Sequence, residues 1–318
     1  MQHPLNTGYT ARTTAKDIIK DKDMTGKVVI ITGGSAGLGL ETTKALASAG
    51  AQIIVPARRV SEAKHALNGF PNVVIFPEEF DLSKRNTIVA FVQWFQSQYE
   101  KLDILINCAG IMAIPKRKDE YGNELQISVN YLGHYYLIKG LLPQLKNANG
   151  ARVVNLSSRG HWFGEFDFED PNFEVSEYDK WLAYGRAKTA VSLLSVALDD
   201  IYKKDNIRAF SVHPGSIVTN LSRNLSDQEM RAMGAITSSG TRGFENYNNE
   251  NKTVSEGAAT IVWCALSPAL DGIGGVYCEN CDIAPIVLDE EMQIGVKPWA
   301  VNLGLAHKLW KETPNIFY

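Results

Sequence analysis

Short runs of β-branched and aliphatic residues alternate along the chain with longer stretches in which apolar residues recur every three or four positions. The short runs predict strands at residues 27–32, 52–55, 72–76, 103–107, 151–157, 207–213 and 274–279. The longer stretches predict helices at 37–49, 83–100, 124–146, 180–203 and 255–266, and we also expect a short surface helix near 13–19. This alternation is typical of repeated strand–helix units around a parallel sheet.

No linker interrupts the alternation, so we expect one α/β domain. It is predicted to be a doubly wound parallel-sheet (Rossmann) domain at 27–282, with about seven strands and helices on both faces. An N-terminal extension at 1–26 precedes it, and a C-terminal tail at 283–318 would either close over the site or pack on another subunit. Residues 220–253 break the alternation and are expected to form a substrate lid, because long insertions are usually functional lids or disordered loops.

A glycine-rich turn links the first predicted strand to the first long helix. It reads Thr32-Gly33-Gly34-Ser35-Ala36-Gly37-Leu38-Gly39. Glycines let the backbone approach a pyrophosphate, and the following helix presents free N–H groups to the anion. We therefore predict a dinucleotide site formed by Gly33, Ser35, Ala36, Gly37, Leu38 and Gly39. The alternative is a turn selected only for tight packing of the helix on the strand.

Arg58 and Arg59 follow the second predicted strand, where NAD-dependent folds place an acid for the ribose 2′-hydroxyl. An arginine suits a 2′-phosphate instead, and one charge-assisted hydrogen bond is worth about 1.5–3 kcal/mol. Arg58 therefore predicts NADP(H) in preference to NAD(H), unless the two arginines are only solvated charges that cap a helix. Asp81 and Leu82, after the third strand, are expected to meet the adenine, although Asp81 could equally be a helix N-cap.

Tyr184 and Lys188 lie four residues apart on a predicted helix and so share one face, while Ser157 ends the preceding strand. Free tyrosine has a pKa near 10, so it needs its phenolate stabilised to act near neutral pH. At about 4 Å and an effective dielectric of about 20, a lysine charge supplies roughly 4 kcal/mol. We predict that Tyr184 exchanges a proton with a substrate oxygen, and that Ser157 hydrogen-bonds this same oxygen.

These motifs, in this order, resemble the short-chain dehydrogenase/reductase family. The resemblance rests on Thr32-Gly33-x-x-x-Gly37-x-Gly39, Asn107-Cys108-Ala109-Gly110, Asn130, Ser157, Tyr184-x-x-x-Lys188 and His213-Pro214-Gly215, and it covers about 26–282. The N-terminal segment, the long insert after Ser157 and the text near residues 274–285 are similar to the retinol dehydrogenase and WW-domain oxidoreductase branch.

The resemblance implies a role for each matching residue. Asn107, Ala109 and Gly110 would support the sheet and touch the adenosine ribose. Asn130 would hold a water that links Lys188 to solvent, and Lys188 would also bind the nicotinamide ribose. Pro214, Gly215, Ile217 and Thr219 would flank the nicotinamide. Cys108 departs from the more frequent Asn or Ala at its position.

The leading hypothesis is an NADP(H)-dependent carbonyl reductase or alcohol dehydrogenase that acts on a hydrophobic ketone, aldehyde or alcohol. Two alternatives stay open: a C=C reductase of the enone or protochlorophyllide type, and a non-catalytic dinucleotide-binding sensor. Retention of Ser157, Tyr184 and Lys188 together argues against the sensor. The aromatic stretch 161–163 is expected either to line the substrate mouth or to anchor a loop, and we assign no proton-transfer role to His134 or His161.

Composition limits the classes of partner that the chain is expected to bind. The formal net charge is -3 with acids and bases interleaved, which provides no basic field for nucleic acid or an anionic membrane. No signal sequence or membrane span is recognisable, so we expect a cytoplasmic protein with a small-molecule substrate. Either a monomer or an oligomer is compatible with the sequence. Cys278 and Cys281 form a C-x-x-C, but no second pair or nearby His completes a zinc site, so we favour a structural role and expect no metal.

Overall fold

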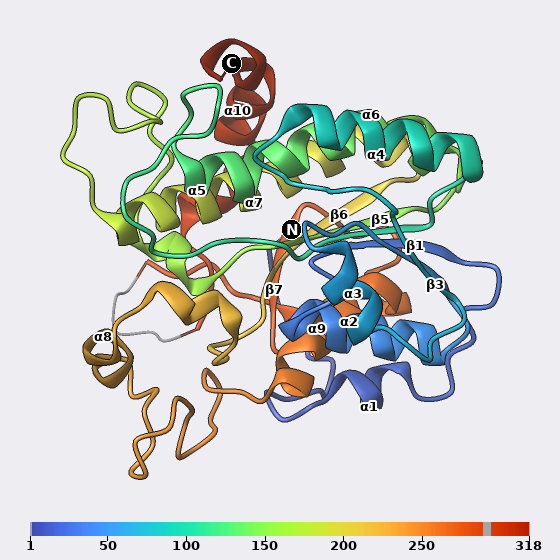
Figure 1. The fold of residues 1–318 in the computed structure, drawn as a ribbon, viewed down its shortest axis with the longest axis horizontal. Coiled ribbons are helices and arrows are strands. Elements are labelled where there is room, and N and C mark those ends of the chain that lie inside the picture. The colour runs from blue at the N-terminus through green and yellow to red at the C-terminus, as the bar shows by residue number, and fades with distance from the viewer. Residues whose placement is uncertain (1, 289–293, 318) are drawn as a thin grey trace.

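The computed structural model describes residues 2–288 and 294–317, which form three layers with a sheet between two layers of helices (Figure 1). Within these residues the sheet has eight strands, in the order β3-β2-β1-β4-β5-β6-β7-β8. The strands are β1 (Val28–Thr32), β2 (Gln52–Val55), β3 (Val73–Ile75), β4 (Ile104–Asn107), β5 (Arg152–Leu156), β6 (Arg208–His213), β7 (Val276–Glu279) and β8 (Asp282–Ile283). The first seven pair in parallel, and β8 pairs antiparallel with β7.

The predicted fold class, a doubly wound α/β domain, is confirmed, and all seven predicted strands are present. The strand count is one higher because β8 is only two residues long and follows a turn in which Asn280 and Cys281 have φ of 52° and 57°. Such a short strand leaves no hydrophobic pattern to read. The strand order reverses between β1 and β4, and ligands of open α/β sheets bind beyond the carboxyl ends of strands at such a point.

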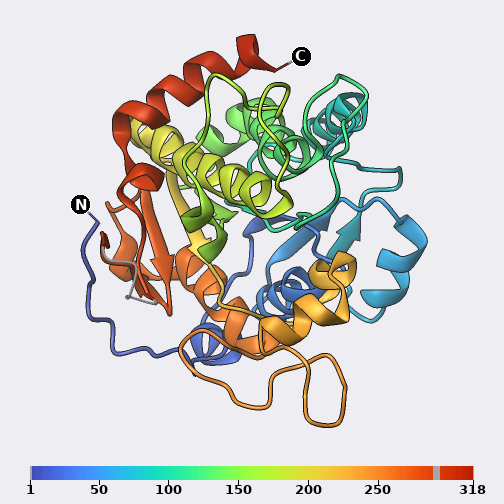
Figure 2. The same ribbon diagram turned by 90° about the vertical axis from the view of Figure 1, so that its left-hand side faces the viewer.

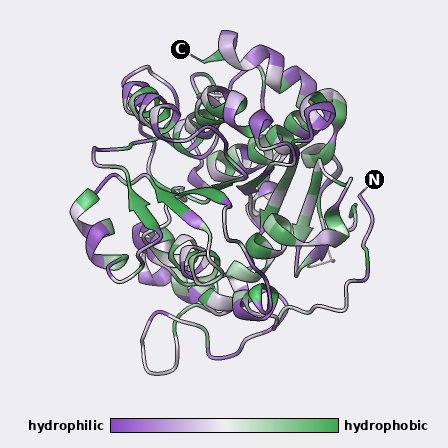
Figure 3. Ribbon diagram, turned by 90° about the vertical axis from the view of Figure 1, so that its right-hand side faces the viewer, coloured by the Kyte–Doolittle hydropathy of each residue, from purple (hydrophilic) through white to green (hydrophobic). Residues whose placement is uncertain are grey.

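Each face of the sheet is covered by its own set of helices (Figures 1 and 2). One layer contains α1 (Ala15–Ile19), α2 (Gly37–Ser48) and α9 (Val254–Leu266), and the other contains α4 (Arg85–Gln98), α6 (Gly133–Asn147), α7 (Lys180–Tyr202) and α10 (Leu303–Ile316). Ile30 packs into one core cluster, whereas its neighbours Val29 and Ile31 pack into the other. Burial on both faces explains the continuous apolar runs, and in Figure 3 the strands are largely hydrophobic whereas the helices beside them mix hydrophobic and hydrophilic residues.

The predicted helix at 124–146 is not continuous. It consists of α5 (Leu125–Ile127), a π-helical segment at Ser128–Leu132, and α6. Asn130 lies in this π-helical segment, and π-bulges occur frequently at functional sites. Several short elements were not predicted: α3 (Val60–Ala66), α8 (Asp227–Ala232) and the 3₁₀ turns at Arg159–Phe163, Lys203–Asp205, Asn220–Asn224, Pro268–Leu270 and Pro298–Val301.

The segments outside the predicted domain both pack against it. The Gln2 amide donates to the carbonyls of Tyr277 and Ala284 and accepts from the Tyr277 N–H, which attaches the N-terminal arm to β7. In the tail, α10 packs on α7, and the Thr313 hydroxyl lies 2.5 Å from the Tyr131 hydroxyl. The described tail therefore packs on its own chain.

Two kinds of feature are absent from the described residues. Among residues 2–288 and 294–317, no helix has the length and apolar character needed to cross a membrane. In the same part of the chain no three His, Cys, Asp or Glu side chains are grouped as metal ligands. Cys278 and Cys281 are buried free thiols in the core cluster that also contains Cys264, as the structural interpretation of the C-x-x-C expects.

Candidate active site

A cavity of about 910 Å³ lies beyond the carboxyl ends of the central strands. This volume is in the range of sites that bind cofactors and small substrates. The structure brings most of the predicted residues to its wall: Gly33, Ser35, Ala36, Gly37, Leu38, Gly39, Arg58, Asp81, Leu82, Ala109, Gly110, Ser157, Tyr184, Lys188, Pro214, Gly215, Ile217 and Thr219. Asn107 and Asn130 do not line it; both are buried behind the wall, and the Asn107 amide donates to Asn155 Oδ1 over 2.7 Å.

The glycine turn packs tightly against the start of α2 and lines the cavity. Gly33 has φ of 67°, and a Cβ added at Gly39 would lie 2.2 Å from the Gly33 carbonyl oxygen. Helix α2 begins at Gly37, and its N-cap, Ala36, has no side-chain oxygen with which to occupy the first N–H groups. These donors and the helix dipole are therefore available to an anion in the cavity.

Behind the turn, buried hydrogen bonds fix the neighbouring loop. The Thr32 hydroxyl accepts from the backbone N–H groups of Cys108 and Ala109 at 3.0 and 3.1 Å, and lies 3.0 Å from His134 Nε2. Burial lowers the His134 pKa to about 4, so the imidazole is neutral at pH 7. Its Nδ1 therefore donates to the Asn130 carbonyl at 3.0 Å, and Nε2 accepts from Thr32.

His134 is a positioning residue that sequence reasoning missed. The available signal was its i+4 spacing from Asn130 on the predicted helix. The Asn130 side chain in turn binds both the N–H and the carbonyl of Ile111, at 2.9 and 3.0 Å. Its amide thus supports the 109–111 loop.

The two serines after β5 differ in orientation, and their contacts favour Ser158 over the predicted Ser157 as the partner of Tyr184. The Ser157 hydroxyl donates to the Lys188 carbonyl at 2.9 Å and accepts from Ser192 Oγ at 2.8 Å, so it is engaged with α7. The Ser158 side chain instead interacts with the Tyr184 hydroxyl and accepts from the Gly160 N–H. Ser158, which also lines the cavity, is the serine whose hydroxyl accompanies Tyr184.

Tyr184 and Lys188 lie together, as their spacing predicts, with Lys188 Nζ 5.6 Å from the centroid of the Tyr184 ring. Burial raises the Tyr184 pKa to about 12, and the interaction with Ser158 offsets this only in part. Burial also lowers the Lys188 pKa to about 8. The expected lowering of the tyrosine pKa is thus outweighed here by desolvation, and Tyr184 is a protonated donor at neutral pH.

A hydrogen bond to the backbone fixes the Lys188 ammonium in place. Its Nζ donates to the Leu156 carbonyl at 2.6 Å, at the end of β5. A Cβ added at Gly110 would lie 2.9 Å from Asn130 Oδ1 and 3.9 Å from Lys188 Nζ, so both groups border the same glycine. The ammonium has further protons available toward the cavity that it lines.

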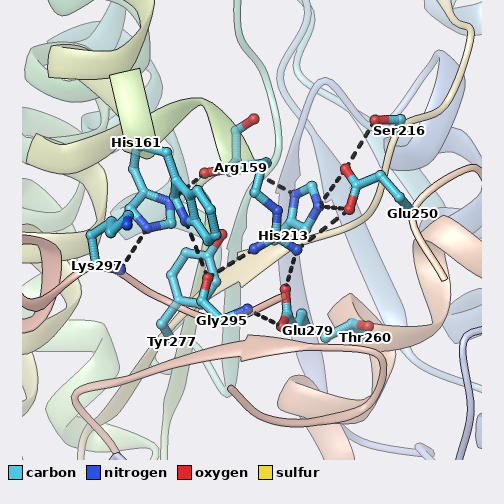
Figure 4. A network of polar contacts seen from close by, with 12 residues as sticks. Arg159, His161, His213, Ser216, Glu250, Thr260, Tyr277, Glu279, Gly295 and Lys297 are labelled. Carbon is cyan, nitrogen blue, oxygen red and sulfur yellow. Dashed lines mark hydrogen bonds and ion pairs between the residues drawn. The ribbon is translucent and has the colours of Figure 1, made fainter. Parts of the chain in front are cut away.

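A charged network closes the cavity at the ends of β6 and β7 (Figure 4). The Arg159 guanidinium pairs with Glu279 at 2.6 Å and with Glu250 at 3.4 Å. His213 Nδ1 accepts from the Arg159 N–H at 3.0 Å, so Nε2 carries the proton and donates to Glu250 at 3.0 Å. Burial opposes ionisation of Glu250, but the hydrogen bond from His213 and the charge of Arg159 hold the pKa of this carboxyl well below its usual range. Glu250 thereby attaches the end of the 220–253 segment to the strand ends.

Part of the cavity wall is apolar. It includes Met112, Phe163, Trp181, Met230, Met233 and Phe244, most of them on α7 or in the 220–253 segment. Of the stretch 161–163, Phe163 lines the cavity, whereas His161 is buried, donates to the Ser158 carbonyl at 2.7 Å and accepts from the Lys297 N–H. Phe163 packs edge-on against Trp181, with ring centroids 5.9 Å apart.

Arg58 and Asp81 lie at the other end of the cavity. Arg58 is exposed, and its neighbour Arg59 pairs with Glu62 at 3.0 Å. Asp81 Oδ1 accepts from both the N–H and the hydroxyl of Ser83, so this carboxylate stabilises a turn while it also faces the cavity. The N-cap of α4 is Lys84, three residues further on.

Comparison with known proteins agrees with this geometry. The family described as short chain dehydrogenase matches residues 27–230. The "Probable oxidoreductase" of Streptomyces lividans is 40% identical over 91% of this chain and 97% of that protein, and retinol dehydrogenase 11 of Mus musculus is 35% identical over 81% of this chain and 79% of that protein. A crystal structure of an uncharacterized protein from Mycobacterium paratuberculosis aligns with a TM-score of 0.71 and 27% identity over 96% of this chain and 97% of that one. The chain therefore belongs to the short-chain dehydrogenase/reductase family of oxidoreductases, which act on CH–OH and C=O groups with a nicotinamide cofactor.

Proposed function

We propose that this chain is an NADP(H)-dependent carbonyl reductase or alcohol dehydrogenase for a hydrophobic ketone, aldehyde or alcohol. The observation that carries the proposal is a single cavity with a protonated tyrosine beside a lysine, a serine hydroxyl and an apolar wall, and with a glycine turn at a free helix N-terminus. Retinol dehydrogenase 11, a relative by sequence, supports an apolar substrate by its name.

The residues present fit a phosphorylated dinucleotide. The turn from Gly33 to Gly39 would hold the pyrophosphate, because it lines the cavity and leads into the uncapped N-terminus of α2. Arg58 would bind the 2′-phosphate, and Asp81 and Leu82 would border the adenine. Ala109, Gly110 and Lys188 would contact the riboses, with Asn107 behind them, and Pro214, Gly215, Ile217 and Thr219 would flank the nicotinamide. When bound, the nicotinamide supplies or accepts the hydride.

The chain's own groups handle the substrate oxygen. Tyr184 donates its phenolic proton to the oxygen during reduction and takes it back during oxidation. Ser158, in place of Ser157, hydrogen-bonds the same oxygen and stabilises the charge that develops on it. Lys188 keeps a positive charge near the phenol, and Asn130 and His134 hold the loop opposite.

The experiment measures oxidation of NADPH and of NADH, at matched concentration, with aryl ketones, aldehydes, retinal and steroid ketones. We expect NADPH to be consumed faster and the alcohol to form. Tyr184→Phe removes the proton donor and should lower kcat by about 10²–10⁴-fold. A saturated ketone formed from an enone would indicate C=C reduction instead. Tight cofactor binding with no turnover of any substrate would favour the sensor.

The cytoplasmic location expected from the sequence is also part of this proposal. Cell fractionation followed by detection of the intact chain tests it, and recovery with membranes or an organelle would contradict it.

A further inference from the structure

Two separate segments carry arginines to the Arg58 end of the cavity. Arg58 and Arg59 follow β2, whereas Arg223 belongs to the 3₁₀ turn Asn220–Asn224 at the start of the 220–253 segment. All three line the same cavity as the Gly33–Gly39 turn. Only the tertiary fold brings them together, because β2 and the 220–253 segment are far apart in the sequence.

The positive charge at this end is only partly compensated. Arg59 has Glu62 as a partner, and both side chains are largely exposed, at 70% and 61%. Arg223 donates to the Asn220 carbonyl, but within residues 2–288 and 294–317 no carboxylate forms an ion pair with Arg58 or Arg223. Partial burial, and then the charges of Arg58 and Arg59, lower the Arg223 pKa, so the fold holds like charges near one another.

The other polar groups at this end leave room for a strong anion. Ser61, Glu62 and His65 also line it, and the Glu62 carboxylate is already bound by Arg59. A phosphate dianion placed between guanidinium groups would replace their repulsion with charge-assisted hydrogen bonds, which guanidinium groups form in a planar, bidentate geometry. In this family of folds the end of β2 is where the adenosine ribose lies.

We propose that Arg223 is a second ligand of the 2′-phosphate of NADP(H), on the opposite side of the phosphate from Arg58. This inference rests on the proposed cofactor preference and extends it, because the second ligand belongs to the predicted lid. The 2′-phosphate then connects the lid to the sheet. NAD(H), which has a hydroxyl at that position, does not connect the lid to the sheet in this way.

The test uses two fragments that differ only in the phosphate, adenosine 2′,5′-bisphosphate and adenosine 5′-monophosphate, and needs no substrate. Their Kd values are measured by calorimetry for the full chain, for Arg223→Met, for Arg58→Met and for the control Arg231→Met. Arg231 is an exposed arginine of the same segment, on α8, that does not line the cavity. Thermal melting of each variant checks that it is folded.

We expect the full chain to bind the bisphosphate at least about tenfold more tightly, and Arg223→Met to remove about tenfold of that preference while the monophosphate Kd stays unchanged. Arg231→Met should behave as the full chain does. If Arg58→Met lowers the preference and Arg223→Met does not, Arg223 is no ligand, and the cofactor proposal still stands. If the full chain binds both fragments equally, the NADP(H) preference itself fails, and this inference fails with it.

Discussion

Ser157 and Ser158 are adjacent, but their hydroxyl groups face different neighbours. Ser157 is held by the Lys188 carbonyl and Ser192, while Ser158 faces the phenol of Tyr184. Ser158→Ala should therefore lower kcat/KM by about 10²-fold through loss of the contact to the substrate oxygen. Ser157→Ala should leave kcat within a few fold and instead lower the free energy of unfolding by about 1–2 kcal/mol.

Steady-state kinetics and urea denaturation of both variants separate the two roles. Loss of activity in Ser157→Ala with a nearly normal Ser158→Ala would restore the assignment made from the sequence. The sequence could predict the Tyr184–Lys188 pair, because spacing on a helix fixes which residues share a face. It could not decide between two serines, because which of them faces the cavity depends on where β5 ends and on the direction the chain takes afterwards.

The pKa of Lys188 sets an expected pH limit. Burial lowers it to about 8, so the ammonium loses its proton, and its charge, as the pH rises through that value. Tyr184, with a pKa raised to about 12, stays protonated over this range. We expect kcat/KM for carbonyl reduction to decrease above about pH 8, as measured from pH 6 to 10. A profile that stays flat to pH 10 would show that the charge on Lys188 contributes nothing in the free enzyme.

At the scale of elements, one carboxylate joins the far end of the 220–253 segment to the strand ends, beside backbone hydrogen bonds to Ser216 and hydrogen bonds from Arg12. Glu250 binds His213, the Ser216 hydroxyl and Arg159, and so joins the segment to the strand ends. Glu250→Ala should loosen this wall of the cavity and raise KM for the carbonyl substrate about tenfold, with little change in kcat, because it touches neither Tyr184 nor Lys188.

Glu245→Ala is the matched control, since Glu245 is an exposed acid of the same segment whose partner, the Ser238 N–H, also lies within it. Both variants are compared by kcat and KM at saturating cofactor. An equal decrease in kcat and kcat/KM for Glu250→Ala, with KM unchanged, would mean that the network acts on the chemical step and not on the wall.

Most long elements with a clear period were predicted and the short ones were not, but the 14-residue α10 was also missed. The helix from 83 to 100 was expected from its apolar face and is present as α4. The interruption of the 124–146 helix at Asn130 was not, because its side chain and carbonyl are bound by Ile111 and His134, contacts that no local pattern reveals. The six-residue α8 has a capping box but too few turns for a period.

At the scale of the whole molecule, the C-terminal helix contributes to stability rather than to the site. In α10, Leu309 is 1% exposed in the core cluster shared with α6 and α7, and no residue of α10 lines the cavity. Leu309→Ala should reduce the free energy of unfolding by about 2–5 kcal/mol. Activity at 25 °C should stay near normal.

Leu303→Ala, at the half-exposed start of the same helix, serves as the control and should cost much less. Urea denaturation of the two variants gives the comparison. If both lose equal stability, packing of α10 on the domain is not the source of the effect. The sequence left the tail between two alternatives because its aromatic residues do not indicate which surface they cover.

The hydrogen bonds of Gln2 to Tyr277 and Ala284 join parts of the chain that are synthesised at opposite ends of translation. A ribosome adds about 5–20 residues per second, so tens of seconds pass between synthesis of the N-terminal arm and synthesis of Tyr277 and Ala284. Until then the nascent chain carries β6 as an unpaired edge next to apolar surface, which is a hazard for association with other chains. Completion of this sheet is therefore a late event in biosynthesis, and we expect chaperones to hold the growing chain until β7 has emerged.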